Sequence, residues 1–116
     1  MQKNMFTKKI EKTKIMKLLK LIIKILMKNK FLKIYGRVQG VGFRQWTKKQ
    51  AQKYNLNGWV KNCTDKTVEC EVSGLKENID LFSQACLKGP LLSSVKRISE
   101  KNISFKKFKS FIIIGE

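Results

Sequence analysis

From residue 31 to residue 114 the sequence alternates between strand-like and helix-like patterns. The order of these patterns along the chain is compatible with only a few folds. Strands are predicted where apolar and polar residues alternate, and helices where apolar residues recur every three or four positions. The predicted strands are 31–38, 56–62, 67–73, 95–103 and 108–114, and the predicted helices are 44–54 and 76–88. Ile79, Phe82 and Cys86 share one face of the second helix and are predicted to be buried, and Trp59 is expected in the core. The order β-α-β-β-α-β plus a short terminal strand predicts an α+β fold, the ferredoxin-like split βαβ sandwich, in which an antiparallel sheet carries both helices on one face.

The loop between the first predicted strand and the first predicted helix is rich in glycine. Gly36, Gly40 and Gly42 allow backbone conformations that a Cβ atom would forbid, so successive N–H groups can turn toward one point. Such a concavity at the N-terminus of a helix suits an anion of the size of a phosphate. Arg44 adds a planar set of donors that matches phosphate oxygens. The sequence therefore predicts a loop that binds a phosphoryl group.

This loop differs from the two commonest phosphate-binding loops. A Walker A loop requires Lys-Ser or Lys-Thr after its last glycine, whereas Gly42 is followed by Phe43 and Arg44. A dinucleotide-binding loop requires a third glycine three residues after the second, and that position holds Gln45. We therefore do not expect a nucleotide as the ligand.

Composition narrows the chemistry that the chain can perform. The 116 residues suffice for one domain, and 26 Lys and Arg against 8 Asp and Glu give a net charge of +18, which attracts anions without selecting a particular one. There is no histidine, which excludes Ser-His and Cys-His nucleophile pairs and most catalytic zinc sites. The three cysteines, Cys63, Cys70 and Cys86, form no metal-binding pair, and we interpret them as buried thiols in a reducing cytoplasm.

The first 30 residues differ from the remainder and are predicted to form a basic N-terminal extension before a domain at 31–116. They contain ten lysines and one acidic residue, Glu11. Lys17, Lys20, Lys24 and Lys28 recur at helical spacing among apolar residues, and the apolar runs are too short for a transmembrane span. One interpretation is a cationic amphipathic helix on an anionic membrane surface. The other, which the sequence favours, is an appendage outside the fold, disordered or arising from a misplaced start.

Two side chains are candidates for chemistry. Asn62 ends the second predicted strand, which in a split βαβ fold can meet the glycine-rich loop at one edge of the sheet. An amide there can orient a water molecule, although capping the end of a hairpin is at least as good an explanation from spacing alone. Arg44 could be a solvated side chain, but helix N-termini favour acidic residues unless an anion is bound.

Two motifs resemble the signatures of the acylphosphatase family. The first is Ile34-x-Gly36-x-Val38-Gln39-Gly40-Val41-x-Phe43-Arg44, and the second is Gly58-Trp59-Val60-Lys61-Asn62, followed by Val68 and Gly74. The resemblance covers residues 32–115. It implies hydrolysis of a small acyl phosphate to a carboxylate and inorganic phosphate, without metal or cofactor. It also assigns catalysis to Arg44 and Asn62, and the phosphate cradle to the backbone amides of Gln39, Gly40, Val41, Gly42 and Phe43.

Lys66 and Asn55 depart from this family pattern, which commonly has glycine at both positions. Neither touches the proposed site, so the departures bear on stability rather than on activity. We expect a monomeric cytoplasmic enzyme that does not bind nucleic acid. The alternatives are a non-catalytic basic module that binds nucleic acid or a membrane through the same cradle, and the acylphosphatase-like domain of a hydrogenase maturation factor. Those factors are much longer and carry zinc-finger cysteines that this chain lacks.

Overall fold

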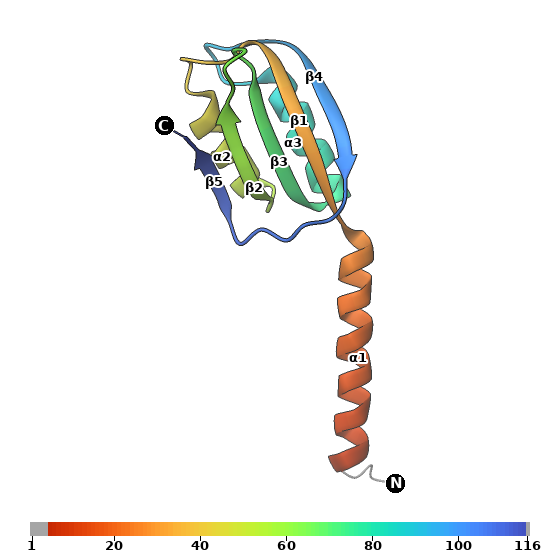
Figure 1. Ribbon diagram of the computed structural model, residues 1–116. Helices are drawn as coiled ribbons and strands as arrows, with labels where there is room; N and C mark the ends of the chain where they lie inside the picture. Colours follow the sequence, from red (N-terminus) through yellow and green to blue (C-terminus); the bar gives the residue numbers. More distant parts are fainter. Residues whose placement is uncertain (1–4, 116) are drawn as a thin grey trace.

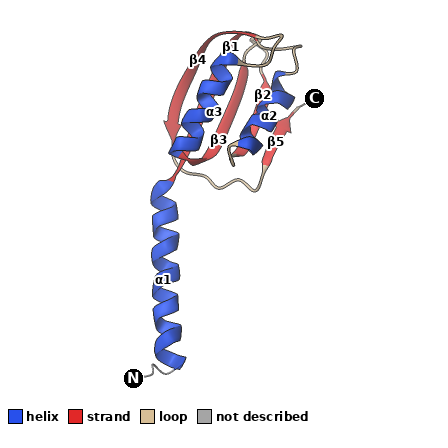
Figure 2. Ribbon diagram, turned by 180° about the vertical axis from the view of Figure 1, so that it is seen from behind, coloured by secondary structure: helices blue, strands red, loops and turns tan. Residues whose placement is uncertain are grey.

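The alternating apolar residues of the strands place one face of a five-stranded sheet against two helices (Figure 1; Figure 2). The structure, a computed structural model, describes residues 5–115 and the side chains of residues 11–115. Its elements are α1 (Met5–Leu26), β1 (Met27–Arg37), α2 (Phe43–Lys53), β2 (Asn57–Asn62), β3 (Val68–Leu75), α3 (Lys76–Lys88), β4 (Ser94–Ile103) and β5 (Phe111–Ile114). The strand order is β4-β1-β3-β2-β5, which confirms the predicted split βαβ arrangement with β5 added at one edge.

The hydrophobic core lies between the sheet and the helices α2 and α3. From α3 it takes Ile79, Phe82 and Cys86, the three residues predicted to be buried from their helical spacing. From the strands it takes the residues of one alternating set: Leu32, Ile34, Val60, Val68, Cys70, Val72 and Phe111. Trp59, which we expected in the core, belongs to the opposite set and packs against Phe31 on the helix-free face, with ring centroids 6.2 Å apart.

Two strands differ from the sequence-based expectation. β1 begins at Met27 rather than at residue 31, because residues 27–30 pair with residues 72–75 of β3, a contact that local pattern does not reveal. The sheet is also not wholly antiparallel, since β5 runs parallel to β2. The chain crosses from β4 to the far edge of the sheet along the end where β2 starts, so β5 has the same direction as β2 (Figure 1).

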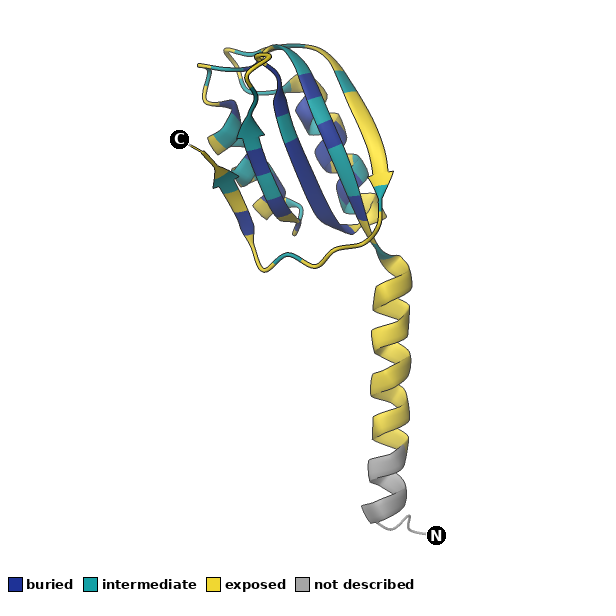
Figure 3. Ribbon diagram, in the orientation of Figure 1, coloured by how far each residue is buried: buried dark blue, intermediate teal, exposed yellow. Residues whose placement is uncertain are grey.

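Helix α1 extends away from the sheet and passes directly into β1, with no residue between Leu26 and Met27 (Figure 1). Lys28, which its spacing placed on the same helix, is instead the second residue of β1. Its side chains from residue 11 to residue 26 are exposed along the whole length (Figure 3). In residues 5–115, no helix combines the length and the apolar character needed to cross a membrane. Residues 1–4 of the predicted extension and Glu116 lie outside the described residues.

The two departures from the family pattern both occupy the left-handed region of the backbone. Asn55, which follows α2, has φ of 56°, and Lys66, in the β2–β3 hairpin, has φ of 69°. The hairpin is closed at this point by a hydrogen bond from the Lys66 N–H to the Cys63 carbonyl, at 3.1 Å. A residue with a Cβ atom is strained in this conformation, and asparagine tolerates it better than lysine does.

We therefore expect Lys66→Gly to raise the free energy of unfolding by about 0.5–1 kcal/mol, because relief of the strain exceeds the added entropy of the unfolded chain. Asn55→Gly is the matched control and should change stability less. Urea denaturation of the three proteins measures both effects. A loss of stability on Lys66→Gly would show that the lysine side chain contributes more to the hairpin than its backbone strain costs.

Candidate active site

The glycine-rich loop connects the end of β1 to the start of α2. Gly40 and Gly42 have φ of 73° and 76°, and Gly42 is the residue that caps the N-terminus of α2. An added Cβ atom would meet no atom within 4 Å at either position, so the backbone conformation, rather than lack of space, requires glycine there. The N–H groups of the first turn of a helix have no acceptor within the helix, so those of α2 are available to a ligand.

The side chain of Gln39 holds this loop against the β2–β3 hairpin. Its Nε2 atom donates to the carbonyl of Cys63 at 2.8 Å and to the carbonyl of Thr67 at 2.9 Å. These two residues flank the hairpin turn, and Cys63 directly follows Asn62. From the sequence we expected only the backbone amide of Gln39 to take part in the site. The structure shows that its side chain also joins the glycine-rich loop to the β2–β3 hairpin, next to Asn62.

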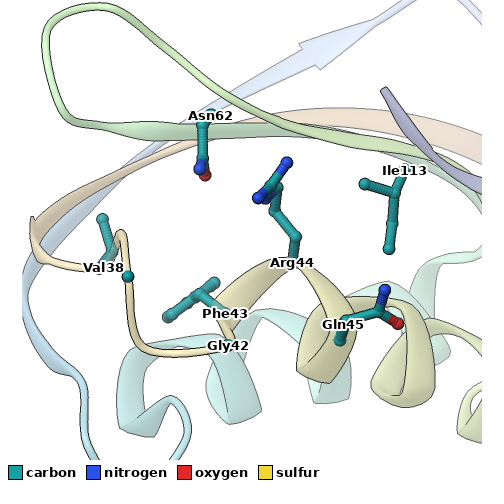
Figure 4. Close-up of a pocket in the computed structure, with 8 residues that line it drawn as sticks. Val38, Gly42, Phe43, Arg44, Gln45, Asn62 and Ile113 are labelled. Carbon is teal, nitrogen blue, oxygen red and sulfur yellow. The ribbon is translucent and has the colours of Figure 1, made fainter. Parts of the chain in front are cut away.

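Arg44 and Asn62 line the same pocket. This agrees with the prediction that the glycine-rich loop and the end of the second strand meet at one edge of the sheet. Arg44 lies in the first turn of α2 and Asn62 is the last residue of β2. Both side chains point into the same space from opposite sides (Figure 4). The residues that line the pocket are Val38, Gly40, Gly42, Phe43, Arg44, Gln45, Asn62 and Ile113. Ile113 was not predicted, because its position depends on which edge of the sheet β5 joins.

The pocket is small and positively charged. Its volume is about 150 Å³, whereas pockets for drug-sized ligands usually have roughly 300–1,000 Å³. Among its lining residues in the described part of the chain none is acidic, so Arg44 provides the only formal charge there. A space of this size and charge suits a phosphoryl group with a water molecule.

The amide of Asn62 carries a buried acceptor that is not satisfied. Its Oδ1 atom is buried and has no hydrogen-bond partner among the residues that the structure describes. Buried polar atoms almost always have a partner, and a water molecule is the ordinary one where protein donors are absent. This atom is therefore suited to accept a hydrogen bond from a water molecule inside the pocket.

The neighbouring thiol is not suited to act as a nucleophile. Burial raises the pKa of the Cys63 thiol above its ordinary value, so the thiol stays protonated at neutral pH. All three cysteines lie in the described part of the chain, and none forms a disulfide. Cys70 and Cys86 are buried, as expected, whereas Cys63 is only partly buried. Residues 5–115 contain no group of three or more His, Cys, Asp or Glu side chains that could hold a metal ion.

Comparison with known proteins agrees with this fold and identifies the family. The acylphosphatase family model matches residues 30–113, so the chain belongs to the acylphosphatase family, which confirms the resemblance seen in its motifs. An acylphosphatase of Clostridium acetobutylicum is 39% identical over 90 residues, which cover 77% of this chain and 99% of that protein. An acylphosphatase of Thermococcus kodakarensis is 38% identical over 84 residues, which cover 72% of this chain and 92% of that protein.

Solved structures show the same relationship. The crystal structure of acylphosphatase from Bacillus subtilis has a TM-score of 0.74 and 35% identity, and the match covers 76% of this chain and 99% of that chain. Full-length HypF, in a phosphate- and nucleotide-bound form, has a TM-score of 0.72 and 36% identity, and covers 77% of this chain. The match covers only 12% of HypF, whereas it covers nearly all of the Bacillus enzyme.

We expect Gln39→Ala to lower the activity toward an acyl phosphate by roughly tenfold or more, because misplacement of the loop by about 1 Å can cost up to roughly a hundredfold. Removal of two hydrogen bonds should also lower the free energy of unfolding by about 1–3 kcal/mol. Steady-state kinetics and urea denaturation measure the two effects.

The control for Gln39→Ala is Gln84→Ala, which removes an exposed glutamine of α3. A positioning role also requires that inorganic phosphate inhibit Gln39→Ala more weakly than it inhibits the wild type. If stability falls while activity and phosphate inhibition stay unchanged, Gln39 supports the hairpin but does not position the loop.

Proposed function

We propose that this protein is an acylphosphatase in which Arg44 and Asn62 carry catalysis and the backbone amides of residues 39–43 hold the phosphoryl group. The observation that carries this proposal is the arrangement of the pocket, in which Arg44 faces the buried amide of Asn62, whose Oδ1 atom has no hydrogen-bond partner within the described part of the chain (Figure 4). Family membership supports the same activity.

The reaction is the hydrolysis of a carboxyl–phosphate anhydride. The oxygen of a water molecule attacks phosphorus, and the bond between phosphorus and the acyl oxygen breaks with its electron pair on the departing carboxylate. The oxygen and both hydrogens of the water end in the phosphate product. Because the carboxylate is a good leaving group, positioning and charge stabilisation suffice as catalytic contributions.

Each part of the site has a separate task in this proposal. The N–H groups of the loop and the guanidinium of Arg44 bind the phosphoryl oxygens and stabilise the charge that develops on them. Asn62 Oδ1 accepts a hydrogen bond from the attacking water and so fixes its direction. Gln39 keeps the loop and Asn62 at a constant separation through its bonds to Cys63 and Thr67.

The alternative function, a non-catalytic anion-binding module, is less consistent with the site and the sheet. An anion binder needs no water-orienting amide beside Arg44. On the helix-free face, the central strand β3 carries Glu69 and Glu71, and Glu71 pairs with Phe31 on one side and Trp59 on the other. A carboxylate between these two aromatic residues opposes the stacking of nucleic acid that such a face would otherwise permit.

We also propose a cytoplasmic location for this protein. The three cysteines form no disulfide, which is typical of proteins in a reducing compartment.

The test is hydrolysis of benzoyl phosphate at neutral pH in the presence of EDTA. We expect turnover by the wild type and a decrease of roughly a hundredfold to a thousandfold in kcat for Arg44→Ala, the magnitude typical for removal of a donor to developing charge. Asn62→Ala should lose about a hundredfold, because the water is no longer oriented.

Two matched variants serve as controls for these losses. Arg37→Ala removes an exposed arginine at the end of β1, and Asn102→Ala removes an exposed asparagine of β4. Both should retain full activity. No turnover by folded wild-type protein would refute the enzymatic function, and loss of activity in Arg44→Ala alone would remove Asn62 from the mechanism.

A further inference from the structure

Helix α1 exposes an apolar surface that no part of the domain covers. From Ile15 to Leu26 it carries nine large apolar residues, each 41–60% exposed: Ile15, Met16, Leu18, Leu19, Leu21, Ile22, Ile23, Ile25 and Leu26. Lys17, Lys20 and Lys24 form one stripe along this part of the helix, because they are spaced by three and four residues. Contiguous apolar surfaces of this extent are rare on soluble proteins and mark sites of interaction.

The charged side chains of α1 from residue 12 onward are all positive. After Glu11 the next acidic residue in the chain is Asp65, so residues 12–64 contain none. The long side chains of the helix lysines can lie along the apolar surface and place their ammonium groups at its border. A helix with this combination of apolar surface and lysines matches the boundary between the head groups and the acyl chains of an anionic bilayer.

A second segment beside α1 also combines apolar and positively charged side chains. Residues 104–110 connect β4 to β5 and contain Phe105, Phe108, Lys106, Lys107 and Lys109. The segment is held to the sheet by two side-chain amides: Asn29 donates to the Lys106 carbonyl at 3.1 Å, and Asn57 donates to the Phe108 carbonyl at 3.0 Å.

The two elements border one hollow of about 360 Å³. Its lining comes from the C-terminal end of α1, the start of β1 and the segment 104–110, together with two strand residues: Lys20, Ile23, Lys24, Met27, Asn57, Ser73, Phe105, Lys107 and Phe108. Apolar side chains from two separate parts of the chain thus lie together, and lysines surround them.

We propose that α1 and the segment 104–110 together bind the surface of a membrane that is rich in anionic phospholipid. The apolar side chains of α1, with Phe105 and Phe108, enter the boundary of the acyl chains, while the lysines contact lipid phosphates. The complementarity of charge selects this partner, because a second copy of the same helix would bring lysines against lysines.

The proposed membrane surface and the candidate active site lie at opposite ends of the sheet. β1 starts at α1 and ends at the glycine-rich loop, and β2 ends at Asn62 on that same side (Figure 1). The pocket is therefore not part of the proposed membrane surface, and hydrolysis of a soluble acyl phosphate should not change when α1 is bound. Membrane binding and catalysis can thus fail independently of each other.

The experiment is flotation of the full-length protein with vesicles of phosphatidylcholine, alone or with added phosphatidylglycerol. We expect binding to the anionic vesicles, little binding to the neutral ones, and release at about 1 M salt, where electrostatic attraction is screened. Inorganic phosphate at constant ionic strength should not release the protein, which separates lipid binding from occupation of the pocket.

Three sets of substitutions locate the surface. Replacement of Lys17, Lys20 and Lys24 together by Gln should weaken partitioning by roughly a hundredfold, since each lysine near an anionic surface contributes about a factor of five. Leu18→Asp with Ile22→Asp should abolish binding, and Phe105→Ser with Phe108→Ser should weaken it several-fold. The control is Leu91→Asp, at a leucine that is 97% exposed far from α1, which should bind as the wild type does.

Activity on benzoyl phosphate shows that each variant is folded, because none of these residues belongs to the pocket. Absence of binding by the wild type, or equal binding to neutral and anionic vesicles, would overturn the proposal. A dimer in sedimentation that Leu18→Asp with Ile22→Asp dissociates, without vesicle binding, would assign the apolar surface to a second copy instead.

Discussion

The position of Arg44 relative to Asn62 depends on strand β3, which is hydrogen-bonded to both β1 and β2. Arg44 lies in the first turn of α2, after the loop that follows β1, and Asn62 ends β2. Because β3 lies between β1 and β2, the separation of the two side chains depends on the register of β3 on each side. Ile34 lies opposite Val68 on one side of β3, and Asn62 lies opposite Val68 on the other. A shift by one residue in either pairing would turn core residues such as Val68 and Cys70 to the helix-free face, so burial of the core also secures the geometry of the site.

Much of this arrangement could be predicted, because it follows from local patterns. Alternation in β3 and helical spacing of Ile79, Phe82 and Cys86 gave the elements and the buried faces, and the glycines before Arg44 indicated the loop that lines the pocket. Interactions that join distant parts of the chain could not be predicted. The hydrogen bonds of Gln39 to Cys63 and Thr67, and the edge of the sheet that β5 joins, depend on tertiary contacts without a local signal.

The N-terminal segment is a second case in which tertiary contacts could not be predicted from local sequence. Its lysine spacing predicted a cationic helix as one of two interpretations, but the sequence favoured a simple appendage. Phe105, Phe108 and their lysines lie about 80 residues further along the chain, and nothing in either stretch indicates that they meet. The hollow between α1 and this segment, rather than the helix pattern, makes a shared binding surface the better interpretation.

The direct junction between Leu26 and Met27 has a consequence for how substrate could arrive. A flexible linker would let the domain turn and change the distance between the pocket and α1. Here helix continues into strand, and the eleven residues of β1 hold the pocket away from α1, at about 3.3 Å per residue. A protein anchored in this way would keep its pocket at one fixed distance from the anchor, so that access of substrate to the pocket would not depend on movement of a linker.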